Sequence, residues 1–325
     1  MSVVAGCSLF DGVLIAADCR ATIKRSGQSE LYSDNILKVF ALFPHTAIGF
    51  VGDIEVASFL LQALLDSVKN RRHCDPISLS NWMPRLFRHQ YARFKSKHGD
   101  RPVVFMIASV LKDRFNIVER KVVADLVNYI GFGKSPIKRT WMPKILIEIL
   151  KTPPQYKWIE LPGTCRNILY EIASPLFEAK TYNPLQFAAI GSGESCIEEI
   201  ALYNDAILAL HPGNSFIESS QFRAIIQRFI ADRKIDTVGG IFPVLKVTGH
   251  GVEHLGIRTE VPVGGTKIEL DCEDGRWKQR NITSGKEIPL LWPWEFLRSL
   301  PKKEHRFDDL NEAFDQFRAP DKDKL

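Results

Sequence analysis

The sequence lacks a long hydrophobic run, a cysteine framework and a strong excess of charge of one sign. No stretch of 18 uncharged apolar residues occurs among the 325 residues, so the sequence predicts no membrane-spanning helix and no membrane partner. The six cysteines form no CxxC pair and no regular spacing, which predicts reduced thiols rather than disulfides or a cysteine zinc site. The net charge of +5 is too small to indicate nucleic-acid binding by itself.

The composition that is present predicts a folded protein. Apolar residues make up 45% and charged residues 25% of the chain, which excludes a disordered chain. The first residues lack the basic start of a secretory signal and reach Asp11 quickly, so we expect a cytoplasmic protein. A prior of about 150 residues per domain gives two domains, and one large core with insertions fits equally well.

The first 51 residues read as two β-hairpins. A β-branched stretch at 2–9 is followed by the turn Asp11-Gly12 and by the apolar run 13–17. A second pair of strands, 36–42 and 46–51, is joined by a Pro-His turn. Continuous apolar strands of this kind are typical of sheets covered on both faces.

Helical and extended patterns then alternate in blocks. Helices are predicted at 53–68, 77–97, 194–210 and 218–234, and further strands at 103–111, 167–173, 187–190, 241–247 and 254–259. This order predicts an α+β fold, a four-layer αββα sandwich of two antiparallel sheets. We assign residues 1–250 to this domain, with an insertion at about 112–166 that is rich in Lys, Pro and Trp. Residues 251–325 form a C-terminal extension with a charged tail.

Ser2 is the first candidate for chemistry. Removal of Met1 before this small residue would leave a free α-amine, whose reference pKa of roughly 7.7–8.0 suits a general base at neutral pH. The hydroxyl and the amine of one residue would then supply nucleophile and base together. Serine is also a very common second residue, so the surrounding sequence has to support this interpretation.

Several segments occur in an order that is specific as a set. They are Gly12–Thr22, Lys38-Val39-Phe40, Gly49-Phe50-Val51-Gly52-Asp53, Ala189–Glu194 and Asp236-Thr237-Val238-Gly239-Gly240. Together they resemble proteasome β-type subunits and their bacterial relatives, a family of N-terminal-nucleophile hydrolases. The resemblance covers about half of the chain, within residues 2–70, 102–111 and 167–250, and this family's four-layer sandwich agrees with the fold predicted above.

The resemblance implies a catalytic role for four residues near the N-terminus. Ser2 occupies the nucleophile position, and Asp18 and Lys38 match the buried acid and base pair beside it. A cation near Ser2 favours its alkoxide and keeps the α-amine neutral. Gly52 matches the residue whose backbone N–H stabilises the tetrahedral oxyanion. Without the resemblance, Lys38 would be a strand-end lysine, Asp18 a turn acid and Gly52 a glycine at the start of a helix.

Further roles follow from the same resemblance. Ser192 and Asp236 match residues that position the amine and relay its proton, although both could simply cap helices. Phe50, with Ala21 and Ile54 nearby, is placed where the family lines the pocket for the residue that precedes the cut. These three side chains predict an apolar, shallow substrate pocket that favours small uncharged residues.

The chain departs from the family pattern at three positions. Ser2 stands where threonine is more common, which keeps the hydroxyl and loses the methyl group that restricts its rotamer. Gly239 stands where the family has a serine next to the amine, so proton handling would depend on Ser192 and water. Met1 precedes the nucleophile and has to be removed for the site to work.

The predicted function is cleavage of peptides or unfolded proteins through an acyl-enzyme on Ser2, without a cofactor. Two alternatives stay open: a non-catalytic scaffold or binding subunit of the same fold, and a small-molecule amidase with the same type of nucleophile. The resemblance implies homo-oligomeric rings and allows an ATPase unfoldase as a partner.

Two other patterns carry less weight. His250, Glu253 and His254 have the spacing of metal ligands on a helix, but they fall in a predicted strand or turn, so no metal site is expected. The insertion is basic, with Trp141 and Trp158 interleaved. This pattern is more typical of a solvated face or a protein contact than of a nucleic-acid platform.

Overall fold

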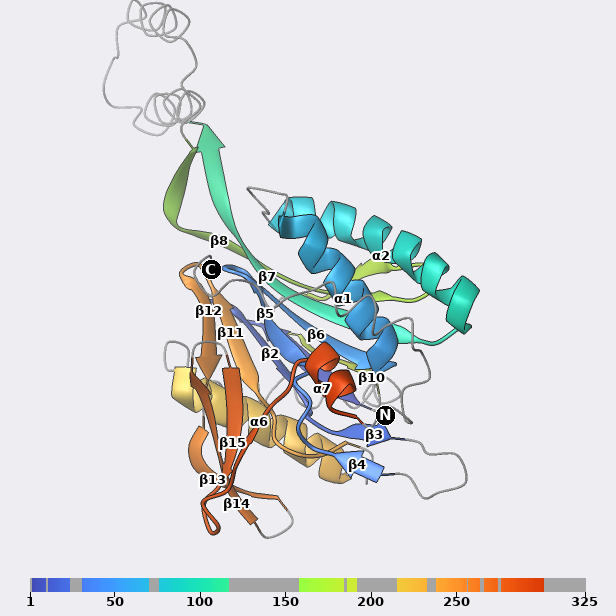
Figure 1. Cartoon of the computed structure of the whole chain (residues 1–325). Helices are drawn as coiled ribbons and strands as arrows, with labels where there is room; N and C mark the ends of the chain where they lie inside the picture. The colour runs from blue at the N-terminus through green and yellow to red at the C-terminus, as the bar shows by residue number, and fades with distance from the viewer. Residues whose placement is uncertain are drawn as a thin grey trace, which may run out of the picture. The chain divides into compact units, whose positions relative to one another are not determined.

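The computed structural model of the chain is shown in Figure 1. It describes residues 2–9, 11–23, 31–69, 76–116, 158–183, 186–191, 215–232, 238–255, 257–263, 266–273 and 276–300. The chain divides into two compact units, one of residues 1–111 with 167–325 and one of residues 112–166. The second unit spans the same residues as the predicted insertion, and its described part comprises the ends of two long strands.

The first sheet has five strands in the order β10-β1-β2-β11-β12, and all neighbours are antiparallel. Its strands are β1 (Val3–Ser8), β2 (Val13–Ala17), β10 (Phe187–Gly191), β11 (Val244–Thr248) and β12 (Gly251–Leu255). The predicted turn closes the first hairpin, since the Leu9 N–H donates to the Gly12 carbonyl at 2.8 Å. Every side chain of β1 and β2 is buried, as expected for strands covered on both faces.

The second sheet also has five strands, in the order β5-β6-β7-β8-β9. They are β5 (Val39–Phe43), β6 (Thr46–Gly52), β7 (Val103–Asn116), β8 (Trp158–Ala173) and β9 (Glu178–Thr181). A short pair, β3 (Ala21–Ile23) and β4 (Leu31–Ser33), stands apart from both sheets. In the register of β6 with β7, Gly52 lies opposite Val103. The end of β6 is therefore adjacent to the segment that precedes β7.

Side-chain alternation along the strands places a helical layer outside each sheet. Val4 and Ile15 point toward the second sheet, where they lie against Gly49 of β6. Val3 and Leu14 point the other way and pack with Phe222 of α6 (Ser215–Asp232). Because successive residues of a strand face opposite sides, one hairpin contributes to both cores.

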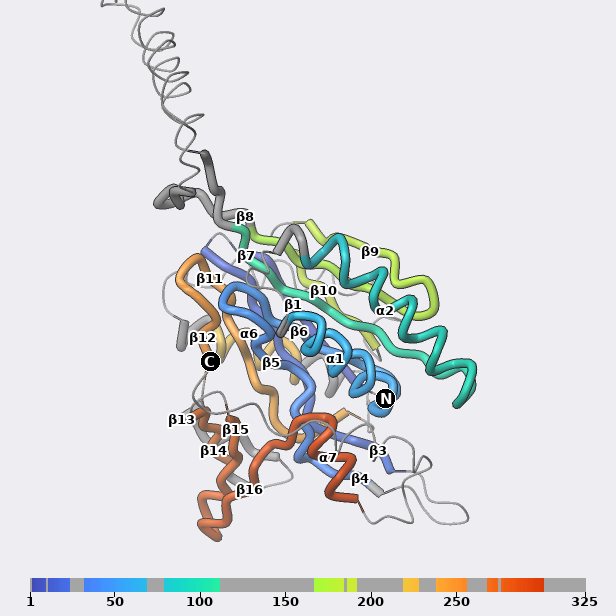
Figure 2. The backbone as a smooth tube through the Cα atoms, turned by 45° about the horizontal axis from the view of Figure 1, so that its top comes forward, coloured from blue at the N-terminus to red at the C-terminus, as the bar shows by residue number. Residues whose placement is uncertain are grey.

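Helices α1 (Ile54–Lys69) and α2 (Pro76–His98) cover the second sheet, as Figures 1 and 2 show. The Phe87 ring of α2 packs on Phe105 of β7 with centroids 4.8 Å apart. Asp53 caps α1 as predicted, because its Oδ1 accepts the N–H groups of Glu55 at 3.0 Å and Val56 at 3.1 Å.

The described part of the chain is thus an α+β structure with antiparallel sheets and four helices. Its layers run from α6 through two facing sheets to α1 and α2. The helix predicted at 194–210 lies outside the described residues. None of the helices that the structure describes is long and apolar enough to span a membrane.

The C-terminal segment is built into the main unit, which corrects the boundary predicted at residue 250. Strand β12 continues the first sheet beyond that point by pairing with β11. A separate four-stranded sheet follows, and then helix α7 (Pro293–Ser299), which packs on α1. Its strands are β13 (Ile257–Val263), β14 (Thr266–Glu273), β15 (Arg276–Asn281) and β16 (Glu287–Pro289). Of the two strands that flank residues 249–250, β11 also pairs with β2, whereas β12 lies at the edge of the sheet.

Candidate active site

Ser2 and Lys38 are in direct contact. Ser2 immediately precedes β1, and Lys38 immediately precedes β5 of the facing sheet. The Lys38 Nζ donates a hydrogen bond to the Ser2 Oγ at 2.7 Å. The two residues are 36 positions apart in sequence, so the packing of the two sheets brings them together.

Asp18 completes this cluster from the end of β2. Its Oδ2 lies 2.9 Å from the Lys38 Nζ and accepts the Arg20 N–H at 3.1 Å. Its Oδ1 accepts the Val3 N–H at 2.9 Å. The Asp18 side chain is 0% exposed and that of Lys38 is 1% exposed. One carboxylate therefore fixes both the lysine and the backbone that follows Ser2.

The Lys38 ammonium has three acceptors around it, which matches its three N–H donors. They are the Ser2 Oγ, the Asp18 Oδ2 and the Arg20 carbonyl oxygen. As an ammonium whose charge is balanced by Asp18, Lys38 can stabilise negative charge on the Ser2 Oγ.

The electrostatics of Asp18 reflect its burial. Desolvation raises the pKa of its carboxyl, and the Lys38 ammonium with the Val3 and Arg20 N–H groups opposes that rise. Removing both ions from water costs several kcal/mol each, so such a pair is weak evidence of stabilisation. A buried, hydrogen-bonded ion pair beside a serine hydroxyl is instead typical of a site where charge has to be controlled.

Two glycines with positive φ shape the backbone around Ser2. Gly191, at φ 81°, pairs with Val3, and a Cβ there would overlap the Ser2 carbonyl oxygen. Gly52, at φ 103°, packs its Cα against the Pro102 carbonyl in the same way. Both positions need glycine for its conformational freedom and for its missing side chain.

Gly191→Ala is expected to displace Ser2 and to lower peptide turnover more than the control variant Gly99→Ala does. The added Cβ would push on the Ser2 carbonyl, and a non-glycine residue at positive φ costs about 1–3 kcal/mol in addition. Gly99→Ala is the matched control, because Gly99 has φ 85° but nothing within 4 Å of its added Cβ. Peptide turnover and thermal melting should be measured for both. Equal loss of activity in the two variants would contradict a positioning role for Gly191.

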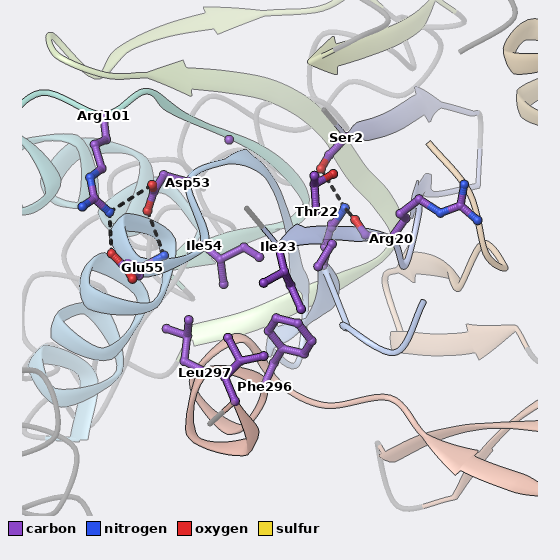
Figure 3. A pocket seen from close by; sticks show the side chains of 14 residues that line it. Ser2, Arg20, Thr22, Ile23, Asp53, Ile54, Glu55, Arg101, Phe296 and Leu297 are labelled. Carbon is purple, nitrogen blue, oxygen red and sulfur yellow. Dashed lines mark hydrogen bonds and ion pairs between the residues drawn. The ribbon is translucent and has the colours of Figure 1, made fainter. Parts of the chain in front are cut away.

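A pocket of about 500 Å³ opens beside Ser2 (Figure 3). Three predicted site residues besides Ser2 and Lys38 line it, namely Ala21, Gly52 and Ile54. The remaining lining residues are Arg20, Thr22, Ile23, Asp53, Glu55, Arg101, Phe296, Leu297 and Leu300. Figure 3 shows Ser2 toward one side of this pocket and Arg101 toward the other, with Ile23, Ile54 and Leu297 between them.

Phe50 does not line this pocket, contrary to the prediction. Its side chain is 1% exposed and its ring lies 6.5 Å from that of Phe105. Gly49 faces the first sheet, so alternation turns Phe50 toward the helical layer. The sequence correctly placed the residue on β6, but the side of the strand depends on which face meets the other sheet.

Arg20 fills the space next to Gly239. A Cβ on Gly239 would overlap the Arg20 guanidinium, which binds Asp34 through Nε at 2.7 Å and Nη2 at 2.9 Å. A side chain at position 239 would therefore require the Arg20 guanidinium to shift. Ser192 and Asp236, the other residues predicted to handle protons, lie outside the described residues.

The far end of the pocket was not predicted from the sequence. Arg101 donates to the Asp53 Oδ2 at 3.2 Å and also binds the Glu55 carboxylate. Asp53 was predicted as a helix cap, which it is, but its second interaction depends on the β6–β7 pairing that brings Arg101 close. Phe296, Leu297 and Leu300 had no local signal, since no pattern in 293–300 points to a residue near the N-terminus.

Among the described residues, no group of three or more His, Cys, Asp and Glu side chains could hold a metal ion. Comparison of the sequence with models of known protein families and with curated proteins finds no match. The geometry itself shows a serine hydroxyl held by an ammonium whose charge is balanced by a buried carboxylate, at the edge of a pocket. Such an arrangement can stabilise a serine alkoxide during attack on an electrophilic carbon.

Proposed function

We propose that the protein is an N-terminal-nucleophile hydrolase of the proteasome-like type, which cleaves peptide bonds through an acyl-enzyme on Ser2. The observation that carries this proposal is the 2.7 Å contact of the Ser2 Oγ with the buried Lys38 ammonium. The two facing antiparallel sheets with helices outside them are compatible with that fold. A cytoplasmic homo-oligomeric ring is part of the same proposal.

The proposed reaction begins after Met1 has been removed. The neutral α-amine of Ser2 takes the hydroxyl proton while Oγ attacks the carbonyl carbon of the peptide bond, and Lys38 stabilises the developing charge on Oγ. The carbonyl oxygen becomes the oxyanion, for which the backbone N–H of Gly52 is the proposed donor. The C–N bond then breaks and the leaving amine receives the proton from the α-ammonium. A water molecule, deprotonated by the same amine, hydrolyses the ester and restores Ser2.

The contacts of Asp18 support this division of roles. By accepting the Val3 N–H at 2.9 Å, the carboxylate fixes the strand that carries Ser2. By binding Lys38, it balances the charge of the buried ammonium. In this proposal Lys38 stabilises charge on Oγ, and the α-amine of Ser2 is the base.

The buried pair also bears on the alternatives. A scaffold has no need of an ion pair that is costly to desolvate and lies against a serine hydroxyl, so the site favours an enzyme. A small-molecule amidase would use the same residues, since the pocket volume lies within the range of about 300–1,000 Å³ seen for small ligands. A panel of peptides and small amides separates these two substrate classes.

A covalent probe tests the proposal directly. A β-lactone should add one adduct mass to the N-terminal peptide of protein that has lost Met1, because both the free amine and Oγ are required. Protein that retains Met1 should remain unlabelled. Intact-mass measurement followed by peptide mapping gives the result. Labelling elsewhere in the chain, or equal labelling of protein that retains Met1, would contradict the assignment of Ser2.

The pH profile should contain two protonations on its acid side. Activity first falls tenfold per pH unit as the α-amine, with a reference pKa of about 7.7–8.0, takes up a proton. It should fall a hundredfold per unit once Asp18 is also protonated, and this happens above the ordinary aspartate pKa of about 3.9 because burial raises the pKa of Asp18.

The contribution of Asp18 to the stability of the fold changes with pH in the opposite direction to the activity. Since the folded state binds the Asp18 proton more tightly than the unfolded chain does, this group favours folding as the pH falls and loses that contribution as the pH rises through its folded pKa. The steeper loss of kcat/KM at low pH should therefore occur without a drop in melting temperature caused by protonation of Asp18. A slope that stays at one down to about pH 4 would show that Asp18 titrates normally.

A further inference from the structure

Helix α7 forms a wall of the pocket although it lies near residue 300. Phe296 and Leu297 of α7 and Leu300 just after it are lining residues, together with Ser2. Figure 2 shows α7 beside the beginning of α1, and Figure 3 shows Phe296 and Leu297 below Ile54 and Ile23. The side chains of Phe296 and Leu297 are only 2% and 5% exposed, so this wall is packed rather than loose.

The segment just before α7 is anchored to the segment that carries Lys38. The Leu37 N–H donates to the Leu291 carbonyl at 2.8 Å, and the Leu291 N–H donates to the Asn35 carbonyl at 2.7 Å. Next to this bridge, the Trp292 ring packs on Phe40 with centroids 4.7 Å apart. The backbone before Lys38 and the Phe40 ring after it are therefore tied to the start of α7, which gives the wall a fixed position relative to Lys38.

The inner surface of this wall is apolar. Ile23 and Ile54 lie next to the α7 side chains in the lining of the pocket, and the charged groups gather beyond them. There, Asp53 and Glu55 both bind Arg101. An apolar stretch therefore lies between the nucleophile and this charged end of the pocket.

We propose that α7 is the specificity-determining wall of this site and selects a bulky apolar residue, such as Leu or Phe, on the acyl side of the cleaved bond. This inference rests on the proposed function of Ser2. It replaces the shallow pocket for small residues that the sequence predicted, because the apolar side chains of α7 and the volume of about 500 Å³ could not be foreseen. An acidic residue would have to leave water for an apolar surface and should be rejected.

A peptide panel that varies only the residue before the cut tests the proposal, with Gly, Ala, Leu, Phe and Glu at that position. Processed protein should prefer Leu and Phe over Ala by about tenfold or more in kcat/KM, since each methylene in an apolar pocket contributes about 10–200-fold. Leu300→Trp should fill the pocket and lower cleavage after Phe about tenfold more than cleavage after Gly or Ala. Trp294→Leu is the control on α7, because Trp294 stacks on Trp292 and is not a lining residue.

The outcomes separate this inference from the proposed function. A selective loss of cleavage after Phe in Leu300→Trp, without such a loss in Trp294→Leu, supports the specificity role of α7. An equal loss for all peptides, or no change, overturns that role but leaves the proposed hydrolysis intact. If the parent protein hydrolyses no peptide, the proposed function fails. In that case, calorimetry with peptide acids ending in Phe or Gly on Ser2→Ala protein decides the pocket separately. Tighter binding of the acid ending in Phe than of the acid ending in Gly, with this difference lost when Leu300→Trp is added, supports the specificity role of α7. Equal binding of the two acids, or no binding, overturns it.

Discussion

Replacing Lys38 with methionine is expected to lower peptide turnover about a hundredfold or more, because one preorganised charge that stabilises the reacting oxygen contributes roughly 3 kcal/mol. Methionine keeps much of the side-chain length and removes the ammonium that lies 2.7 Å from the Ser2 Oγ. The variant should also lose stability, since Asp18 would be left buried without its cation, at a cost of about 3–5 kcal/mol. Steady-state kinetics and thermal melting have to be measured together.

A second buried lysine provides the control. Lys246 on β11 is 2% exposed and binds Asp11 at 2.6 Å, in the same sheet as Ser2 but away from the pocket. Lys246→Met should leave turnover within about twofold, because Lys246 lies away from the pocket. It should still reduce stability, although its partner Asp11 is 39% exposed and can be solvated.

The double variant Asp18→Asn with Lys38→Met separates the two effects of the ion pair. Removing both charges should recover part of the stability lost in the single variant, while activity remains low. If the double variant recovers activity together with stability, Lys38 acts only by supporting the fold.

Ser2→Ala is expected to abolish hydrolysis while the protein still folds and still loses Met1. Alanine is as small as serine, so removal of the initiator methionine should continue, but no oxygen remains for the acyl-enzyme. Ser2→Thr should keep substantial activity because the hydroxyl and the amine are both present. Measurement of intact mass and of peptide hydrolysis distinguishes failed processing from lost chemistry.

Ser8→Ala is the matched control for the loss of a hydroxyl on the same strand. Ser8 lies on β1, 2% exposed, and its Oγ has no hydrogen-bond partner among the described residues. Its removal should be neutral or slightly stabilising, with unchanged turnover. Hydrolysis by Ser2→Ala at the parental rate would show that the mechanism proposed here is wrong.

The sequence was most informative where structure is decided by near neighbours. The Asp11-Gly12 turn, the apolar run 13–17 and the Asp53 cap were all predicted, since a turn, a buried strand and a helix start each depend on a few adjacent residues. The order of strands and helices then restricted the fold to an α+β arrangement with antiparallel sheets. The family resemblance singled out Asp18 and Lys38, which the structure places in contact with each other.

Tertiary structure decided everything that depends on which face of an element meets another element. Phe50 lies on the predicted strand, yet its side chain points into the helical layer because Gly49 faces the first sheet. The space beside Gly239 is occupied by the Arg20 guanidinium, and no local sequence pattern predicts this contact.

The pocket wall is the clearest case. Helix α7 lines the same pocket as Ser2, almost 300 residues away in the sequence, and the bridge between Leu291 and the segment before Lys38 holds it there. Such a contact has no local signature in sequence, because its stability comes from packing between elements that are far apart along the chain. The sequence by itself therefore determined the strands, the turns and the candidate nucleophile with its ion pair. Folding decided what surrounds that nucleophile, because the pocket is made of side chains that only long-range packing brings together.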